Sequence, residues 1–349
     1  MITINNQLYL KIRKNAFILF SILKSLNPSA YYVLWIKGLK LGLFPIDILI
    51  SILEKPFLAN VPETRFPIIF VVGIHRTGST FVSQVLADKL GCAPLGNYAA
   101  IFPRSKILIP SLIKRFYNPS EKRNEKNYKS YYGISRGIFS IGDCYEVWDR
   151  WMGQDHYNKP ESLTAEKQEK MSHHLRWLQH SWGLPLITKN NRNSLILKSI
   201  HKSVPNAFFV MVLRKPADVI LSTMQASRDF YGSDEIIWGL KPDKTFSRDN
   251  YKDKLDAYCY QYINLEDSIR QDLLSLPEED YFVVQYEAFC EDPERIQKDL
   301  ARKIKAKHEL PEKSQGITSP KRHFSKRRFN KKIHSEINKR LKEIKEKQR

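Results

Sequence analysis

Short apolar runs alternate along the chain with longer segments in which apolar residues recur every three or four positions. The short runs predict buried strands, and the periodic segments predict helices. Strands that alternate with helices indicate an α/β fold, a doubly wound parallel sheet flanked by helices, with ligands bound at the carboxyl ends of the strands. The predicted strands are residues 68–72, 185–188, 208–213 and 281–285, and the predicted helices are residues 79–90, 165–182, 194–203, a helix from Pro216, 252–274 and 293–305.

The first sixty residues predict helices that end at a turn over residues 60–62. Their apolar stretches, residues 16–23 and 39–53, are shorter than the roughly 18 uninterrupted apolar residues of a spanning helix, and Pro45 and Asp47 interrupt the second stretch. Basic and aromatic residues are mixed there. Two interpretations stay open: helices that lie on a membrane surface, or a helical layer packed on the core.

A glycine-bounded loop, residues 73–78, joins the strand at 68–72 to the following helix. Its Gly-x-x-x-x-Gly spacing matches a phosphate-binding loop, in which backbone N–H groups and a helix N-terminus bind an anion. Nucleoside triphosphatases carry Lys at the next position, where this chain has Ser79, and Arg76 is the nearest replacement. The loop therefore indicates a phosphate-bearing cofactor other than Mg·ATP. The alternative is an ordinary strand–helix turn with incidental glycines.

The composition of the chain predicts an anionic partner. The 349-residue chain is 42% hydrophobic, which is typical of a globular protein, and it has a net charge of +20. Nucleic acid, an acidic membrane, an anionic sugar or a phosphorylated cofactor would each fit such a charge. The four cysteines show no CxxC or metal-ligand spacing, so we expect reduced thiols in a cytoplasmic protein and no metal site.

Residues 206–222 add a second anion motif. Together with residues 73–80 they resemble the sulfotransferases that use 3′-phosphoadenosine 5′-phosphosulfate (PAPS). The resemblance implies a P-loop-like sulfotransferase fold in which the loop holds the 5′-phosphosulfate. It also implies that an Arg ending a strand and a Ser eight residues later, here Arg214 and Ser222, hold the 3′-phosphate. Arginine suits this role because it offers a fork of donors.

The resemblance extends from about residue 67 to about residue 329, through residues 185–194, 286–293 and 321–325. The cofactor-binding residues that it implies are His75, Arg76, Thr77, Gly78, Ser79, Thr80, Arg214, Ser222, Lys321 and Arg322. This chain also departs from the family pattern. His75 stands where Pro is usual, Lys215 replaces a common Asp, and the Lys-x-His motif of one branch is absent. We therefore carry over no catalytic histidine and expect His201, within a helix, to be structural.

For catalysis we expect Arg76 and Lys189 to neutralise charge on the leaving phosphate. Glu146 is the first candidate for the base that takes the acceptor proton, because some sulfotransferase branches use a glutamate, and Asp143 is the neighbour to test against it. An alternative is that Glu146 only pairs with Arg150 one turn later.

The resemblance implies a sulfotransferase that moves the sulfuryl group of PAPS onto a hydroxyl or amine of a carbohydrate, lipid or small-molecule acceptor. Residues 92–155 should shape the acceptor pocket. A nucleotide or sugar kinase remains an alternative, and so does a non-catalytic protein that binds nucleic acid or anionic membranes, although no nucleic-acid module is recognisable. We expect a cytoplasmic protein, free or at the membrane surface. We also expect an N-terminal helical extension at 1–62, a sulfotransferase domain at 63–330 and a basic C-terminal helix or tail at 331–349.

Overall fold

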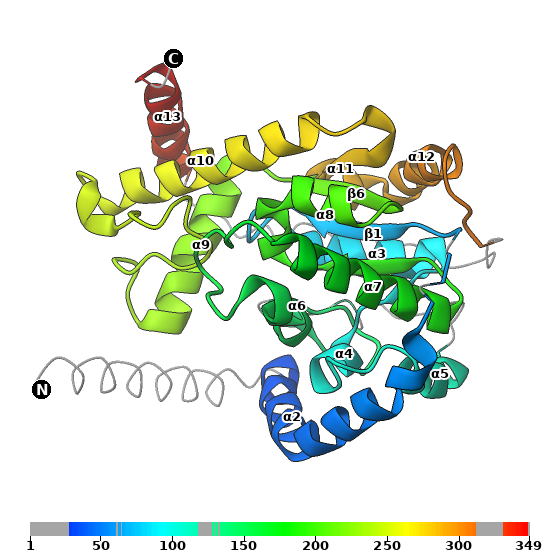
Figure 1. The fold of residues 1–349 in the computed structure, drawn as a ribbon. Coiled ribbons are helices and arrows are strands. Elements are labelled where there is room, and N and C mark those ends of the chain that lie inside the picture. The colour runs from blue at the N-terminus through cyan, green and yellow to red at the C-terminus, as the bar shows by residue number, and fades with distance from the viewer. Residues whose placement is uncertain are drawn as a thin grey trace, which may run out of the picture.

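A five-stranded sheet lies at the centre of the chain in the computed structural model, which describes residues 28–60, 62–63, 65–117, 128, 130–131, 133–311 and 331–347 (Figure 1). Its strands are all parallel and follow the order β2-β5-β1-β6-β7, as expected for a doubly wound sheet. The strands span Ala93–Pro94 (β2), Leu186–Lys189 (β5), Ile68–Val72 (β1), Ala207–Leu213 (β6) and Tyr281–Gln285 (β7). The four predicted strands are confirmed, and the short edge strand β2 was not predicted.

The register of the sheet brings three strand ends together. Val71 of β1 pairs with Lys189 of β5, and Val72 pairs with Met211 of β6. The chain segments that leave these three strands therefore start side by side, at the edge where ligands bind in sheets of this kind. Each of the three inner strands is almost fully buried, since helices cover both of its faces.

Alternate side chains of β1 point into two hydrophobic cores. Ile69 and Val71 pack among the helices of one face, and Ile68, Phe70 and Val72 pack among those of the other. The first face is covered by Ser79–Leu90 (α3), Tyr286–Glu291 (α11) and Pro293–Lys305 (α12). The second is covered by Tyr145–Met152 (α6), Ala165–Trp182 (α7), Leu197–Ser203 (α8), Pro216–Tyr231 (α9) and Lys254–Leu274 (α10).

One predicted helix differs from the structure. The sequence predicts a single helix over residues 194–203, but the chain forms a 3-10 turn, Asn191–Leu195 (η4), followed by α8. The cause is tertiary: the Ser194 hydroxyl is bonded to the backbone of Gly73, and the Asn190 side chain accepts from the Arg192 N–H. These bonds hold the segment against the end of β1.

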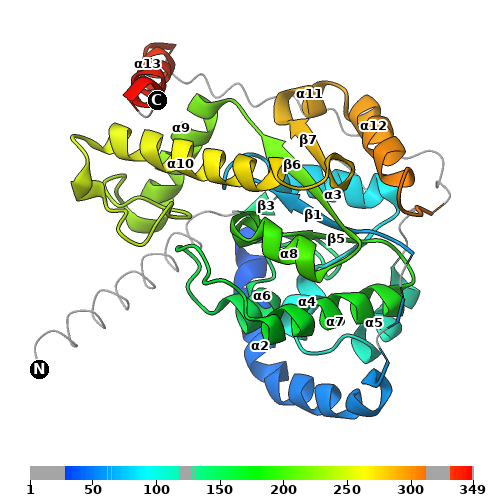
Figure 2. The same ribbon diagram turned by 45° about the horizontal axis from the view of Figure 1, so that its top comes forward.

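The N-terminal part of the described chain is one long helix, Pro28–Leu53 (α2), which contains Pro45 and bends along its length (Figure 2). It packs on the short helix Asn97–Ile101 (α4). The described part of the N-terminal segment is therefore helical, as expected. None of the helices that the structure describes combines the length and the apolarity that crossing a bilayer requires.

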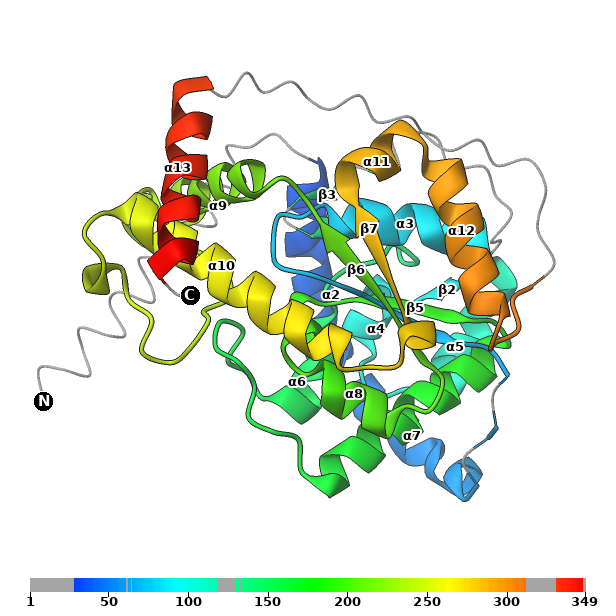
Figure 3. The same ribbon diagram turned by 90° about the horizontal axis from the view of Figure 1, so that it is seen from above.

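The C-terminal helix Lys331–Lys347 (α13) packs across α10 and α9 (Figure 3). Arg340 holds it there through ion pairs with Asp253 and Asp256 at the start of α10. The division of the chain at residues 62 and 330 stays a prediction. The remaining elements are Lys55–Leu58 (η1), Leu108–Ile113 (α5), Lys114–Phe116 (η2), Ser130–Tyr131 (β3), Ile134–Ser135 (β4), Arg248–Asn250 (η5) and Glu278–Asp280 (η6).

Candidate active site

The loop after β1 is tightly packed at its start. Gly73 has φ +137°, and a Cβ there would lie 2.7 Å from the carbonyl oxygen of Val212 in β6. The Gly73 N–H donates to Ser194 Oγ at 2.9 Å, and the same hydroxyl donates back to the Gly73 carbonyl at 3.0 Å. The loop therefore leaves the sheet between β6 and η4, in a path that only glycine permits.

The loop then turns into α3 through two residues in the left-handed region. Arg76 has φ +67° and Gly78 has φ +90°, and a Cβ on Gly78 would lie 2.2 Å from the Tyr286 ring. Thr77 Oγ1 donates to the Ile74 carbonyl at 2.9 Å, which stabilises the turn from within. An α-helix leaves its first N–H groups without an intrahelical acceptor, so the N-terminus of α3 can bind an anion.

Arg214, at the end of β6, contacts this loop. Its Nη1 donates to the Arg76 carbonyl at 3.2 Å, and its guanidinium lies over the Tyr286 ring, 5.0 Å from the centroid. The Nε of Arg214 is buried and has no hydrogen-bond partner among the described residues. A buried donor of this kind is costly unless a ligand accepts from it.

Ser222, two turns into α9, contacts Arg76 from the other side, because its Oγ accepts from Arg76 Nε at 2.9 Å. The two sequence motifs therefore meet at Arg76, with Arg214 at its backbone and Ser222 at its side chain. An unsatisfied guanidinium donor beside a helix N-terminus fits a cofactor that carries more than one phosphate.

Lys189 ends β5 and lies in the same region. Its Nζ forms an ion pair with Asp143 Oδ1 at 2.7 Å, and both side chains are less than one-tenth exposed. The Asp143 segment is fixed as well, since the Asn190 side chain donates to the Asp143 carbonyl at 2.6 Å. A cation that is almost fully buried requires such a partner. The cation therefore has a fixed position beside the loop.

His75 is buried in the loop and does not occupy a solvent-facing position. Its ring lies edge-on to Trp238 with the centroids 5.4 Å apart, and the Leu240 N–H donates to its Nδ1 at 3.4 Å. Burial, with a further contribution from Arg76 and Lys189, lowers the pKa of His75 to about 3. The imidazole is therefore neutral at neutral pH, and its role in the structure is to join the loop to the segment over residues 238–240.

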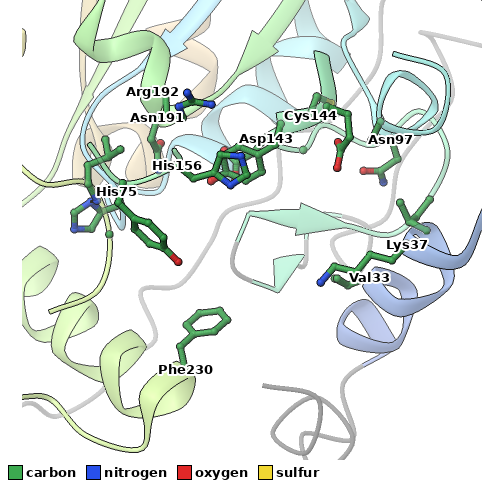
Figure 4. A pocket seen from close by; sticks show the side chains of 18 of the residues that line it. Val33, Lys37, His75, Asn97, Asp143, Cys144, His156, Asn191, Arg192 and Phe230 are labelled. Carbon is green, nitrogen blue, oxygen red and sulfur yellow. The ribbon is translucent and has the colours of Figure 1, made fainter. Parts of the chain in front are cut away.

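A cavity of about 410 Å³ lies next to these groups (Figure 4). Figure 4 shows Asp143 and His156 between His75 on one side and Val33 and Lys37 of α2 on the other. The walls come from separate parts of the chain: α2, α4, the start of α6, residues 156–157, η4, Phe230 and residues 238–240. Residues 92–155 thus form part of the wall, as expected, and the other segments form the rest of it.

Glu146 lies in the wall of this cavity and forms an ion pair with Lys40 of α2. It does not pair with Arg150, whose Nη1 donates to the Pro103 carbonyl at 2.8 Å and contacts His174 Nδ1. The structure therefore gives Glu146 another partner than the predicted Arg150, and its role as the base stays a prediction. Lys40 was not predicted, because it lies 106 residues away in the chain.

A second titratable group in the cavity was also not predicted. His156 lines the cavity, and its Nε2 lies 2.9 Å and 3.0 Å from the two carboxylate oxygens of Asp149. Asp149 also accepts from the buried Arg192 at 2.8 Å, and the His156 ring stacks on Tyr145 with the centroids 4.2 Å apart. The only signal in the sequence is the seven-residue separation of Asp149 and His156, which does not distinguish this pair from others.

Two of the predicted cofactor-binding residues, Lys321 and Arg322, lie outside the described residues, so their assignment to the cofactor stays a prediction. Among the described residues, no group of three or more His, Cys, Asp or Glu side chains could hold a metal ion. His201 Nε2 lies 2.8 Å from Asp280 Oδ2, and Asp280 also forms an ion pair with Lys307.

Comparison with known proteins identifies the family. The model of the sulfotransferase family matches residues 67–309. Sulfotransferase STF1 from Mycobacterium tuberculosis H37Rv has a similar fold, with a TM-score of 0.53, 13% sequence identity, and coverage of 84% of this chain and 81% of that one.

Sulfotransferase STF9 from Mycobacterium avium gives a TM-score of 0.45 at 15% identity, with coverage of 73% of this chain and 67% of that one. No curated protein sequence matches the chain. The family match spans the β1 loop, the β6–α9 motif and both core faces of the sheet. The chain therefore belongs to the sulfotransferase family and is an enzyme of the PAPS-dependent type.

Proposed function

We propose that this sulfotransferase binds PAPS across Arg76 and transfers its sulfuryl group in line onto an acceptor held in the 410 Å³ cavity. The observation that carries the proposal is the position of Arg76, between Ser222 at 2.9 Å and Arg214 at 3.2 Å. A nucleotide with phosphates at both ends of its ribose would use both motifs at once. PAPS, when bound, supplies the activated sulfuryl group.

The chain's own residues would hold the two ends as follows. The N–H groups at the start of α3, with Thr77, Gly78, Ser79 and Thr80, would bind the 5′ end, because this helix N-terminus favours negative charge. Arg214 and Ser222 would bind the 3′-phosphate, with the unpaired Nε of Arg214 as one donor. In this proposal His75 belongs to the same loop and shapes it through packing.

Arg76 and Lys189 would neutralise the charge that develops on the leaving phosphate. Lys189 is suited to this because Asp143 fixes its ammonium group at 2.7 Å, so no reorganisation is needed during the reaction. In this proposal Asp143 positions Lys189 and takes no proton from the acceptor.

We propose Glu146 as the base that takes the proton from the acceptor hydroxyl or amine. Its carboxylate lines the cavity and is held in place by Lys40. His156 is the second candidate, since it lines the same cavity and Asp149 orients its ring. Both groups have the geometry of a supported base.

The acceptor proposed is a carbohydrate, lipid or small-molecule alcohol or amine. The cavity lies in the size range of pockets for small molecules. Aromatic rings of Tyr145, Tyr157 and Trp238 line it beside the ionisable groups, which suits an acceptor with an apolar body and a hydroxyl. A kinase is the less favoured alternative, because Ser79 occupies the lysine position of Mg·ATP loops.

Binding of adenosine 3′,5′-bisphosphate tests the cofactor assignment. We expect it to raise the melting temperature where ATP and GTP with Mg²⁺ do not. Arg214→Ala should weaken binding about 10–100-fold in calorimetry, because charged hydrogen bonds to the 3′-phosphate are lost. The exposed neighbour Lys215→Ala is the matched control and should bind as wild type. Equal affinity of the Arg214 and Lys215 variants would contradict the proposed 3′-phosphate site.

A further inference from the structure

Helix α2 has an unusual distribution of charge. Residues 28–58 contain only two carboxylates, Asp47 and Glu54, and both are fully buried. Asp47 accepts from the Arg104 side chain at 2.8 Å. Glu54 accepts from Ser105 Oγ at 2.5 Å and from the backbone N–H groups of residues 106–108 at the start of α5. The acidic side of α2 therefore faces the protein.

The apolar side of α2 faces outward. We call the exposed large apolar side chains on α2, η1, α5 and η2 the outer face. It holds thirteen of the eighteen large apolar side chains that are exposed among the described residues. Leu41 is 81% exposed, Phe57 63% and Phe116 71%. Surface helices normally show the opposite arrangement, and a contiguous apolar surface usually marks an interaction site.

The outer face is continuous because Glu54 joins the end of α2 to the start of α5. In Figures 1 and 2 α2 runs along the boundary of the molecule, and no described element covers its outer side. The exposed charged side chains on η1 and η2 are basic and include Lys55 and Arg115, and residues 108–116 contain no carboxylate. An apolar surface with cations and without exposed carboxylates matches an anionic lipid surface.

We propose that the outer face docks on an anionic lipid bilayer, with its apolar side chains at the level of the acyl boundary and its cations at the headgroups. The inner side of the same helix lines the cavity through Val33, Ile36 and Lys40. Docking therefore brings the wall of the cavity next to the lipid. The proposal rests on the surface of the fold and does not require the proposed reaction.

Vesicle binding tests the proposal with the full chain, without cofactor or acceptor. The probe is a 100 nm vesicle of phosphatidylcholine with about one-fifth phosphatidylserine, and binding is measured by co-sedimentation. We expect binding to these vesicles and weaker binding to pure phosphatidylcholine. The double variant Leu41→Gln/Phe57→Gln should bind at least about tenfold more weakly, because two large apolar side chains no longer enter the boundary. Lys55→Gln should bind about fivefold more weakly, since one cation near the surface is removed.

The matched control replaces two exposed apolar residues elsewhere, Ile236→Gln/Leu274→Gln, which are 54% and 61% exposed and should bind as wild type. The bonds of Asp47 and Glu54 are untouched in all variants, so their melting temperatures should stay close to wild type. Trp35, 56% exposed on α2, gives a second readout. Brominated lipids should quench wild-type fluorescence more strongly than that of Trp35→Phe.

Three results would overturn the proposal. The first is no binding of the folded wild type to anionic vesicles. The second is equal binding of the outer-face variant and its control. The third is a wild type that is a dimer in sedimentation velocity and does not bind vesicles, together with a Leu41→Gln/Phe57→Gln variant that is a monomer. That result would assign the outer face to a second copy of the chain.

Discussion

The loop side and the cavity side of the active site are built in different ways. On the loop side, residues from two short motifs bond directly to each other, with Arg76 between Arg214 and Ser222. On the cavity side, each candidate group is held by a partner from another segment, such as Glu146 by Lys40 and His156 by Asp149. In the proposed function the loop side would therefore bind the cofactor through two local motifs, and the cavity side would hold the acceptor among residues that only the fold brings together.

Replacement of the proposed base should have the largest effect. We expect Glu146→Gln to lower kcat by about 10²–10⁴-fold, the usual contribution of a general base. His156→Gln should lower it by less than about tenfold if it only shapes the cavity. The measurement is release of adenosine 3′,5′-bisphosphate from PAPS with an acceptor found by screening alcohols. A strongly reduced kcat without the acidic limb of the pH profile in His156→Gln, with Glu146→Gln active, would assign the base to His156.

Replacement of Gly78 should have an intermediate effect and tests how rigid the loop side is. Gly78→Ala adds a Cβ at φ +90° that would lie 2.2 Å from the Tyr286 ring. We expect unfolding free energy to fall by about 3 kcal/mol, from left-handed strain and overpacking together. Gly183→Ala is the control, with φ +66° and no atom within 4 Å, and should cost about 1–2 kcal/mol. Urea denaturation of both variants measures this. Equal losses of unfolding free energy would show that the Tyr286 ring moves aside at little cost.

Acidification should have the smallest effect. It concerns His75, which lies in the loop after β1 and also lines the cavity. Its folded pKa of about 3 lies below the ordinary value of 6.5. Between these values the unfolded chain binds more protons, so this contribution to stability is complete above pH 6.5 and is lost as the pH falls. At pH 5 the loss should be about 2 kcal/mol.

His75→Gln should remove this part of the pH dependence, measured as unfolding free energy between pH 7.5 and 5. The exposed His180→Gln is the control and should keep the wild-type slope. An unchanged slope in His75→Gln would mean that the imidazole is not held neutral in the folded protein.

The sequence predicted those parts of the structure that depend on local patterns. β1, β7, α3 and α12 have the predicted bounds, because each strand is a local apolar run and each helix has local periodicity, with glycines flanking α3 and a proline starting α12. The turn at Asn191–Leu195 was not predicted, since it depends on Ser194 and Gly73, which are 121 residues apart. The orientation of α2 depends likewise on Asp47 and Arg104, 57 residues apart.

The candidate site likewise has parts that local sequence patterns predict and parts that they do not. The sequence predicted the loop with Arg76 and the Arg214–Ser222 motif as separate anion-binding motifs after strand ends of a parallel sheet, but it did not predict that Arg76 contacts both Arg214 and Ser222. His156 and Lys40 have no such signal. Their places are set by where α2 and residues 153–164 pack on α6, and this packing has no short sequence pattern.

The backbone carbonyl of Arg76 binds Arg214 while its side chain binds Ser222, and this has a thermodynamic consequence. If the two motifs hold opposite ends of one nucleotide, as proposed, the two half-sites share a residue and are energetically coupled. A fragment that fills one half-site would meet an Arg76 that is still bonded to the empty half-site, and it would gain only part of the binding free energy of the whole nucleotide. Cooperativity within a single site would then favour the two-ended nucleotide over mononucleotides.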